Sequence, residues 1–233
     1  MSDNKASMFE NFGNSIFWCK KCNIPLLEEP CGLCHEKGIQ IELTPPGDVR
    51  FASPHDHMII NELIQKSFDA APLDGKLILL NKIPGEDKTD EILVDGIRFG
   101  ALRFDMKGLV FKLDLMIDGA KALMDSGILK KQVRISSRGK HLGGKTIDGG
   151  EVLQCSIDIE KGDTVLVTAG NLKGFGVSYR DSSDLKSPGP SIKVKKIDSG
   201  KSAFLSREPT LDEVIRANAP YMKRLVKDAT NTI

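Results

Sequence analysis

Short apolar segments separated by glycine-containing turns fill the chain between residues 76 and 115, and this pattern predicts a small sheet. The expected strands cover residues 76–80, 91–94, 97–104 and 109–115. A second series of short strands, with turns at residues 161–163 and 187–190, is expected over residues 151–159, 164–168, 174–179 and 191–197. So many short strands within about 70 residues favour a small mixed barrel for the second series.

Two amphipathic helices flank the first series of strands. Ser53 is the expected N-cap of the first helix, Pro54 is its first residue, and Asp56 lies in its positive first turn. Its apolar face carries Ile60, Leu63, Ile64 and Phe68. The second helix is expected over residues 116–125, with a stop at Ser126-Gly127.

The last segment has a helical pattern of its own. Thr210 and Glu213 form a capping box, and Leu211, Val214 and Ile215 begin an apolar stripe. Pro220 is expected to interrupt this helix, with a second helical stretch starting at Tyr221. The apolar edge of this tail could dock on the body of the protein or on another domain, and an exposed edge would favour a partner.

Length and composition allow one large domain or a few small ones. The chain has 233 residues, 40% of them hydrophobic and 28% charged, with a net charge of +1. No apolar run approaches the roughly 20 residues that span a bilayer, and residues 1–14 lack the core of a signal peptide. We therefore expect a cytoplasmic protein with no membrane partner.

The strongest chemical pattern is a C-x2-C-x8-C-x2-C array formed by Cys19, Cys22, Cys31 and Cys34. Two such pairs supply four thiolates for a tetrahedral ion, which predicts a structural zinc ribbon with no open position for a catalytic water. Gly32 is expected to allow the tight turn that brings a thiolate inward. His35 could substitute for one ligand, although a surface histidine is the simpler interpretation.

The most basic window follows residue 128, where six positive charges precede Asp148: Lys130, Lys131, Arg134, Arg138, Lys140 and Lys145. Residues 139–146 also satisfy the phosphate-loop spelling G-x4-G-K-[ST]. That chemistry requires a helix starting at the lysine, and Asp148-Gly149-Gly150 would break such a helix at once. Nucleotide hydrolysis is therefore not expected.

Residues 149–178 carry a recognisable motif. The turn Lys161-Gly162-Asp163-Thr-Val-Leu-Val167, followed by Gly174-Phe-Gly176, resembles the PUA domain, a pseudobarrel that binds structured RNA. In addition, residues 17–34, 44–50, 80–87 and 209–225 resemble the N-terminal part of archaeal phosphoadenosine phosphosulfate reductase-like proteins. Those proteins carry a zinc ribbon and a PUA domain ahead of the reductase, and the tail resembles their helical linker.

The adenylyl-binding loop of that family, Ser-Gly-Gly-Lys-Asp-Ser, is absent from this sequence. The resemblance therefore implies a chain that is not an enzyme by itself: the accessory half of such a protein, with its catalytic partner on a separate chain, or a truncated product. The expected architecture is an α+β multidomain chain with a flexible N-terminus at 1–16, a zinc ribbon at 17–48, an α+β domain at 49–127, a PUA domain at 128–200 and a helical tail at 201–233.

An RNA-binding protein is the leading functional hypothesis, with zinc as structural cofactor and structured, tRNA-like RNA as partner. The candidate contacts are Arg138, Lys140, Gly143, Gly144, Lys145, Lys193 and Lys195. On one strand Lys193 and Lys195 should share a face that Lys196 does not. A solvated basic face, a docking site for a separate catalytic chain on the tail, and a purely structural interaction protein are the alternatives.

Overall fold

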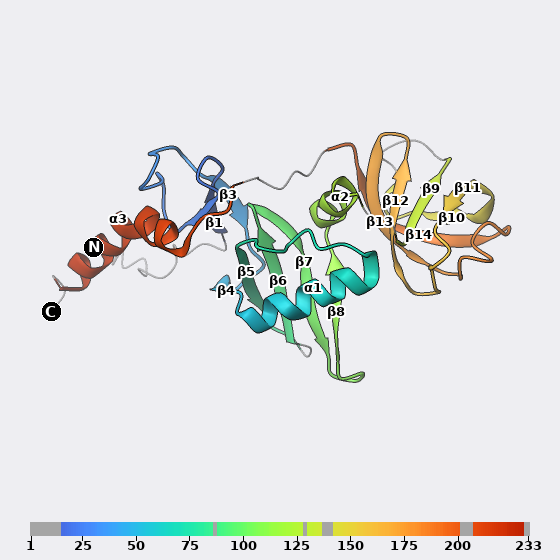
Figure 1. Ribbon diagram of the computed structural model, residues 1–233, viewed down its shortest axis with the longest axis horizontal. Helices are drawn as coiled ribbons and strands as arrows, with labels where there is room; N and C mark the ends of the chain where they lie inside the picture. The colour runs from blue at the N-terminus through green and yellow to red at the C-terminus, as the bar shows by residue number, and fades with distance from the viewer. Residues whose placement is uncertain (1–14, 86–87, 128–129, 137–141, 201–206, 231–233) are drawn as a thin grey trace, which may run out of the picture.

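The computed structural model describes residues 15–85, 88–127, 130–136, 142–200 and 207–230. These residues form a mixed α+β structure with three sheets and three α-helices. Figure 1 shows the sheets in a row, with the ribbon and α3 (Leu211–Thr230) at one end and the six-stranded sheet at the other. Within the described residues no helix has the length and apolar character needed to cross a bilayer.

The ribbon sheet has the order β2-β1-β3, from β1 (Ser15–Cys19), β2 (Ile24–Leu26) and β3 (Ile39–Glu42). The middle sheet is an antiparallel meander of five strands in the order β4 to β8. Its strands are β4 (Asp48–Phe51), β5 (Ile78–Ile83), β6 (Lys88–Val94), β7 (Ile97–Asp105) and β8 (Val110–Leu115). The predicted strands of this region are therefore present, and β4 is an additional edge strand.

Alternation along β5 explains how the middle sheet is covered. Ile78 and Leu80 pack with Ile60 and Ile64 of α1 (Pro54–Phe68), which lies across one face of the sheet (Figure 1). Leu79, between them, points to the opposite face and packs with Trp18 of the ribbon. The helix and the ribbon thus cover opposite faces because successive strand side chains alternate.

α2 (Ile117–Asp125) lies between the middle sheet and the six-stranded sheet, packing on β7 and on β13 (Leu172–Ser178). Gly119 permits this, because a Cβ at that position would lie 1.9 Å from the carbonyl oxygen of Phe99. Both helix boundaries agree with the prediction: Ser53 and Asp56 form a capping box on α1, and Ser126 is the C-cap of α2.

The six-stranded sheet has the order β10-β14-β13-β12-β9-β11, with β9 parallel to β12 and the other pairs antiparallel. Its other strands are β9 (Gln132–Ile135), β10 (Thr146–Asp148), β11 (Val152–Cys155), β12 (Thr164–Ala169) and β14 (Pro190–Asp198). The predicted strand over 151–159 is wrong in extent, because a 3-10 turn at Gly149–Glu151 precedes β11 and a turn follows Cys155.

The expected interruption at Pro220 is also wrong, since α3 runs unbroken from Leu211 to Thr230 with this proline inside it. Proline removes one helical hydrogen bond and strains the preceding turn. That turn is held from outside, because the N–H of Gly32 in the ribbon donates to the carbonyl of Ala217 at 3.0 Å. Packing against the ribbon therefore holds the turn that local sequence rules would break.

Candidate metal centre and candidate nucleic-acid interface

Four cysteine sulfurs converge at the tip of the ribbon. The sulfurs of Cys19, Cys22, Cys31 and Cys34 all lie within 4.8 Å of one another, and those of Cys19 and Cys34 are 3.4 Å apart. A tetrahedral ion with metal–sulfur bonds of about 2.3 Å places its sulfurs about 3.8 Å apart, so this spacing fits a thiolate-bound metal. The four cysteines predicted from their spacing are thus brought together as one cluster that could bind a metal.

The surroundings of the cluster are those of a closed site. Cys19, Cys22 and Cys31 are buried, and the backbone N–H of Cys22 donates to the Cys19 sulfur at 3.4 Å. Burial raises the pKa of Cys19 and of Cys22, so a nearby cation is needed to hold both as thiolates. His35 is exposed and is not one of the clustered groups.

The second cysteine pair is tied to α3 by close backbone contact. A Cβ on Gly32 would lie 2.4 Å from the carbonyl oxygen of Ala217 and 3.1 Å from Pro220 Cδ. Asn218 adds two contacts to the ribbon, donating from Nδ2 to the Pro25 carbonyl and accepting from the Leu27 N–H. Gly32 thus serves the approach of a helix, whereas its expected role was a tight turn; its φ lies outside the left-handed region.

The ribbon is also joined to the middle sheet by a buried polar chain. Trp18 Nε1 donates to Asn23 Oδ1 at 2.9 Å, and Asn23 Nδ2 donates to Asp95 Oδ1 at 2.7 Å. Asp95 in turn pairs with Lys76 at 3.1 Å. Trp18 is fully buried, as expected for a packing residue, and is therefore not a platform for stacking bases.

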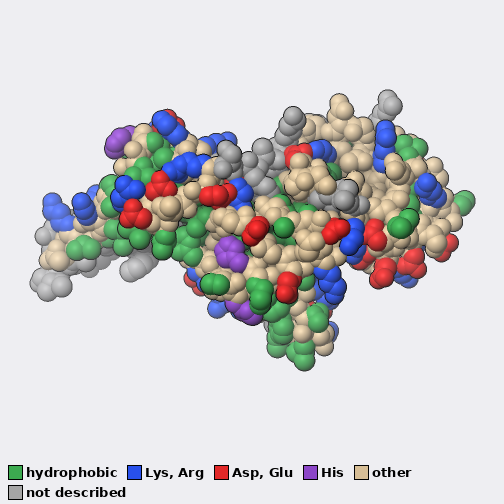
Figure 2. Space-filling view, in the orientation of Figure 1, with side chains coloured by type: hydrophobic (Ala, Val, Ile, Leu, Met, Phe, Trp, Pro, Cys, Tyr) green, Lys and Arg blue, Asp and Glu red, His purple; other side chains and the backbone are tan. Residues whose placement is uncertain are grey.

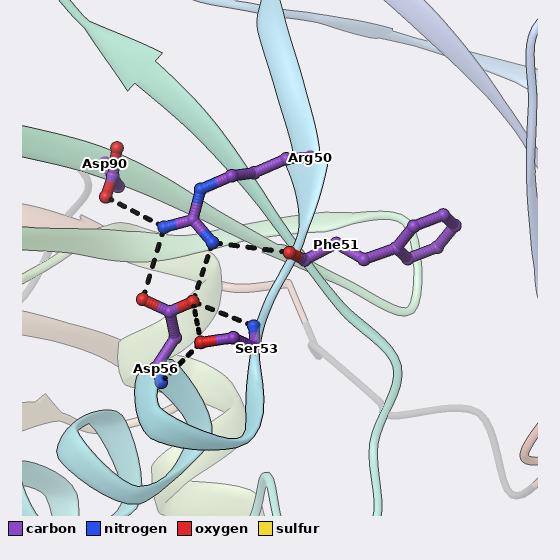
Figure 3. Close-up of polar contacts among 5 residues, drawn as sticks. All are labelled: Arg50, Phe51, Ser53, Asp56 and Asp90. Atoms are coloured by element: carbon purple, nitrogen blue, oxygen red, sulfur yellow. Dashed lines mark hydrogen bonds and ion pairs between the residues drawn. The ribbon is translucent and has the colours of Figure 1, made fainter.

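Arg50 on β4 forms the centre of an ion cluster at the start of α1 (Figure 3). Its guanidinium donates to Asp56 at 2.6 and 3.2 Å and lies 3.5 Å from Asp90 on β6. Asp56 also accepts the backbone N–H of Ser53, which closes the capping box. The Arg50 hydrogen bond is the main reason that the pKa of Asp56 lies well below its ordinary value. One guanidinium thus bridges two carboxylates, one from α1 and one from β6.

The candidate RNA contacts meet at the edge of the six-stranded sheet formed by β10 and β14. Thr146 is paired with Lys193, the N–H of Gly144 donates to the Val194 carbonyl at 2.9 Å, and Lys193 Nζ donates to the Gly144 carbonyl. Lys145 and Lys195 are exposed at this edge. We name Gly143, Gly144, Lys145, Lys193 and Lys195 the β10–β14 edge; Arg138 and Lys140 lie outside the described residues.

Two further expectations from the sequence concern this region. Thr146 begins strand β10 directly after Lys145, so the phosphate-loop spelling has no helix at the position where that chemistry requires one. The expected alternation that would put Lys193 and Lys195 on one face does not hold, because the β13–β14 register shifts at Lys195, between the pairs Phe175–Lys196 and Gly176–Val194. Lys196 lines a pocket with Arg98 and Asp118 beside α2. What the sequence could not show was the pairing of the glycine loop with β14, because the two segments are almost 50 residues apart.

No known protein-family profile matches the chain. The uncharacterized protein MJ0066 of Methanocaldococcus jannaschii is 33% identical over 231 residues, covering 93% of this chain and 48% of that protein. The uncharacterized protein MJ0973 of the same organism is 27% identical over 187 residues, covering 80% of this chain and 40% of that protein. The chain thus spans less than half the length of the curated relatives it matches.

Among solved structures, the chain is similar to a hypothetical protein of Pyrococcus horikoshii, at 16% identity, 63% and 92% coverage of the two chains and a TM-score of 0.49. It is also similar to a conserved PUA-domain protein of Thermoplasma acidophilum, at 12% identity, 65% and 95% coverage and a TM-score of 0.48. A PUA domain of Aeropyrum pernix is 18% identical, with 63% and 83% coverage of the two chains and a TM-score of 0.45. Scores below 0.5 do not establish a shared fold.

Proposed function

We propose that this chain is an RNA-binding module that holds structured RNA through a PUA-type sheet and carries a structural zinc ion in its ribbon. The observation that carries the proposal is the β10–β14 edge, where a glycine-rich loop and three lysines from distant parts of the sequence meet. The overall charge is only +1, so attraction to phosphate must come from such a local concentration of lysines.

The edge suits a phosphate backbone for steric and electrostatic reasons. Gly143 and Gly144 have no side chains to hold a ligand away, and a Cβ on Gly144 would meet nothing within 4 Å. Lys145 and Lys195 are exposed cations in the two segments that form this edge, while Lys193 fixes the loop by binding the Gly144 carbonyl. A solvated basic face is the alternative, and it predicts no affinity for RNA.

Zinc is proposed for the cysteine cluster because four thiolates at tetrahedral spacing are its preferred structural ligand set. Four protein ligands leave no position for an activated water, so the ion would hold the ribbon and would not perform chemistry. We accordingly propose a non-catalytic, cytoplasmic protein with the domain boundaries predicted from the sequence. Elemental analysis of purified protein, with about one zinc per chain expected, tests the metal directly.

The RNA proposal is tested by measuring binding of the zinc-loaded protein to bulk transfer RNA over a series of salt concentrations. We expect the affinity to fall steeply as salt rises, because lysines that contact phosphates release counterions. A Lys145→Ala/Lys195→Ala variant should bind more weakly, with a salt slope smaller by about 2, one for each phosphate contact removed.

The matched control removes two exposed lysines from the middle sheet and α1, in a Lys66→Ala/Lys82→Ala variant of equal net charge. An equal loss of RNA affinity in both variants would show that only overall charge matters, and the β10–β14 edge would then not be the binding site. An absence of binding at low salt would overturn the RNA proposal.

A second candidate is a recognition part that works with a further polypeptide, and the length of the relatives favours it. MJ0066 matches this chain with only 48% of its length and MJ0973 with 40%. The reductase-like identity of such a polypeptide, implied by the sequence resemblance, remains a prediction. A complex that binds RNA only when both parts are present would support this candidate over a module that acts alone.

A further inference from the structure

An apolar groove of about 340 Å³ lies where the ribbon, the edge strand β4 and helix α3 meet. Twelve residues line it, and ten of them are apolar, among them Leu27, Phe51, Ile215 and Met222. Figure 2 shows hydrophobic side chains gathered between α3 and the middle sheet. The groove belongs neither to the cysteine cluster nor to the β10–β14 edge.

The side chains around the groove are more exposed than packing within one chain requires. Ile215 is 61% exposed, Leu27 56%, Met222 49% and Phe51 45%. Val214 and Ala217 on α3 are buried against the ribbon, so the helix uses only part of its apolar surface there. Exposed apolar residues that gather in a groove, in contrast to scattered ones, mark an interaction site.

The side chains of the edge strand β4 are arranged so that Arg50 lies toward α1 and Phe51 lies beside the groove. The Arg50 side chain turns toward α1 and is held there by Asp56 and Asp90, whereas the ring of Phe51 points away from these groups (Figure 3). Among the described strands, β4 pairs with β5 alone, because it is the last strand of the five-stranded order. One side of the groove therefore combines an apolar ring with a strand edge that no described strand covers and that can accept another strand.

The apolar surface continues along α3 beyond the groove. Met222, Leu225 and Val226 are exposed in the second half of the helix, together with Lys223, Arg224 and Lys227. Arg224 pairs with Glu28 of the ribbon, and Lys223 and Lys227 add positive charge beside the apolar side chains. A partner that fits this surface offers apolar side chains, with acidic ones opposite these two lysines.

We propose that the groove and the exposed face of α3 dock the polypeptide that the longer relatives carry beyond the region matched by this chain. Those relatives are more than twice the length of the matched part, so they contain further polypeptide that this surface is suited to receive. The groove lies beside the first half of α3, and its apolar lining continues onto the exposed face of that helix. The inference does not depend on RNA binding, because the β10–β14 edge lies on a different sheet.

The test compares two intact proteins by carbene footprinting, which labels exposed side chains of any type. In this chain, Leu27, Phe51, Ile215 and Met222 should label strongly. In full-length MJ0066, the aligned positions should lose this labelling. Positions aligned with Leu109 and Ile157, which are 70% and 95% exposed on other surfaces, serve as controls and should label in both proteins.

An aspartate at the MJ0066 position aligned with Ile215 should restore labelling of the groove, because a charge in the contact would release the docked unit. An aspartate at the position aligned with Ile157 should leave the groove protected, and unchanged control labelling would show that both variants are folded. Full labelling of the groove in unmodified MJ0066 would overturn the proposal. So would protection that increases with concentration in this chain alone, since a second copy would then be the occupant.

Discussion

A single carboxylate, that of Asp56, joins the start of α1 to the edge strand of the middle sheet. It accepts hydrogen bonds from the guanidinium of Arg50 and from the backbone N–H of Ser53. The Arg50 hydrogen bond is the largest of the effects that lower its pKa, and those from Ser53 add to it. The ionised form is thus favoured in the folded state, and this stabilisation is fully present above the ordinary pKa of 3.8.

Replacing this residue, in an Asp56→Asn variant, should lower the free energy of unfolding by about 2 kcal/mol at pH 7, because the charged half of the capping box and the ion pair with Arg50 are lost together. The difference from the unmodified protein should begin to shrink as the pH falls below 3.8, where Asp56 of the unfolded chain takes up a proton, and should disappear only below the lowered pKa of the folded state. Urea unfolding at pH 7 and pH 3 measures this difference in the free energy of unfolding.

The control is an Asp212→Asn variant, which loses an exposed ion pair with Arg216 and should change the free energy of unfolding by less than about 0.5 kcal/mol. A difference that persists unchanged at pH 3 would refute the assignment.

At the scale of elements, the ribbon and α3 depend on one another. The ribbon holds the helix through the Gly32–Ala217 hydrogen bond and the contacts of Asn218, and the carbonyl of Cys22 also accepts from Arg207 just before the helix. The four cysteines fix the ends of the loops that make these contacts. Metal bound at the cysteines should therefore stabilise the start of α3 as well as the ribbon.

Chelation of the metal tests this coupling by hydrogen–deuterium exchange. Removing the ion with EDTA should speed amide exchange in β1 to β3 and in residues 211–220, whereas β12 to β14 should keep their protection. Restoring zinc should reverse the change. If exchange rose only in the ribbon and α3 stayed protected, the helix would be held by other contacts and the proposed dependence would be wrong.

The same elements show which parts of the fold can be predicted from residues close together in the sequence. The caps of α1 and α2 and the strands of the middle sheet follow from residues close in sequence, and these predictions are confirmed. The spacing of the four cysteines likewise predicted their convergence into one cluster that could bind a metal. The continuity of α3 through Pro220 and the role of Gly32 were not predictable, because each depends on a contact almost 190 residues away. Strands β9 and β10 have four and three residues and lie in a basic, glycine-containing window, where alternation is too short to recognise. The grouping of the lysines at the β10–β14 edge likewise depended on pairing between distant strands.

For the whole molecule, one strand of the six-stranded sheet contributes to two cores. Along β12, Val165 and Val167 point into the core of their own sheet, whereas Leu166 is fully buried in the core shared with α1, α2 and the middle sheet. Phe175 on β13 packs against that shared core as well. Because successive side chains point to opposite faces, β12 physically couples the two sheets.

This arrangement predicts that the two sheets unfold in a single transition, and that one substitution should make them unfold in two separate transitions. Leu166→Ala removes a buried side chain from the shared core and should cost about 2–5 kcal/mol. Trp18, the only tryptophan, reports on the ribbon and middle sheet by fluorescence, and amide exchange of β12 to β14 reports on the other sheet. In the unmodified protein both probes should give one midpoint in urea; in Leu166→Ala the midpoints should separate, because the contact that couples the sheets is weakened.

A Val165→Ala variant, adjacent in sequence but facing the other core, should lower the free energy of unfolding while the transitions of the two probes still coincide. Coincident transitions in both variants would mean that other contacts beside α2 couple the sheets, and separate transitions in the unmodified protein would mean that β12 does not couple them.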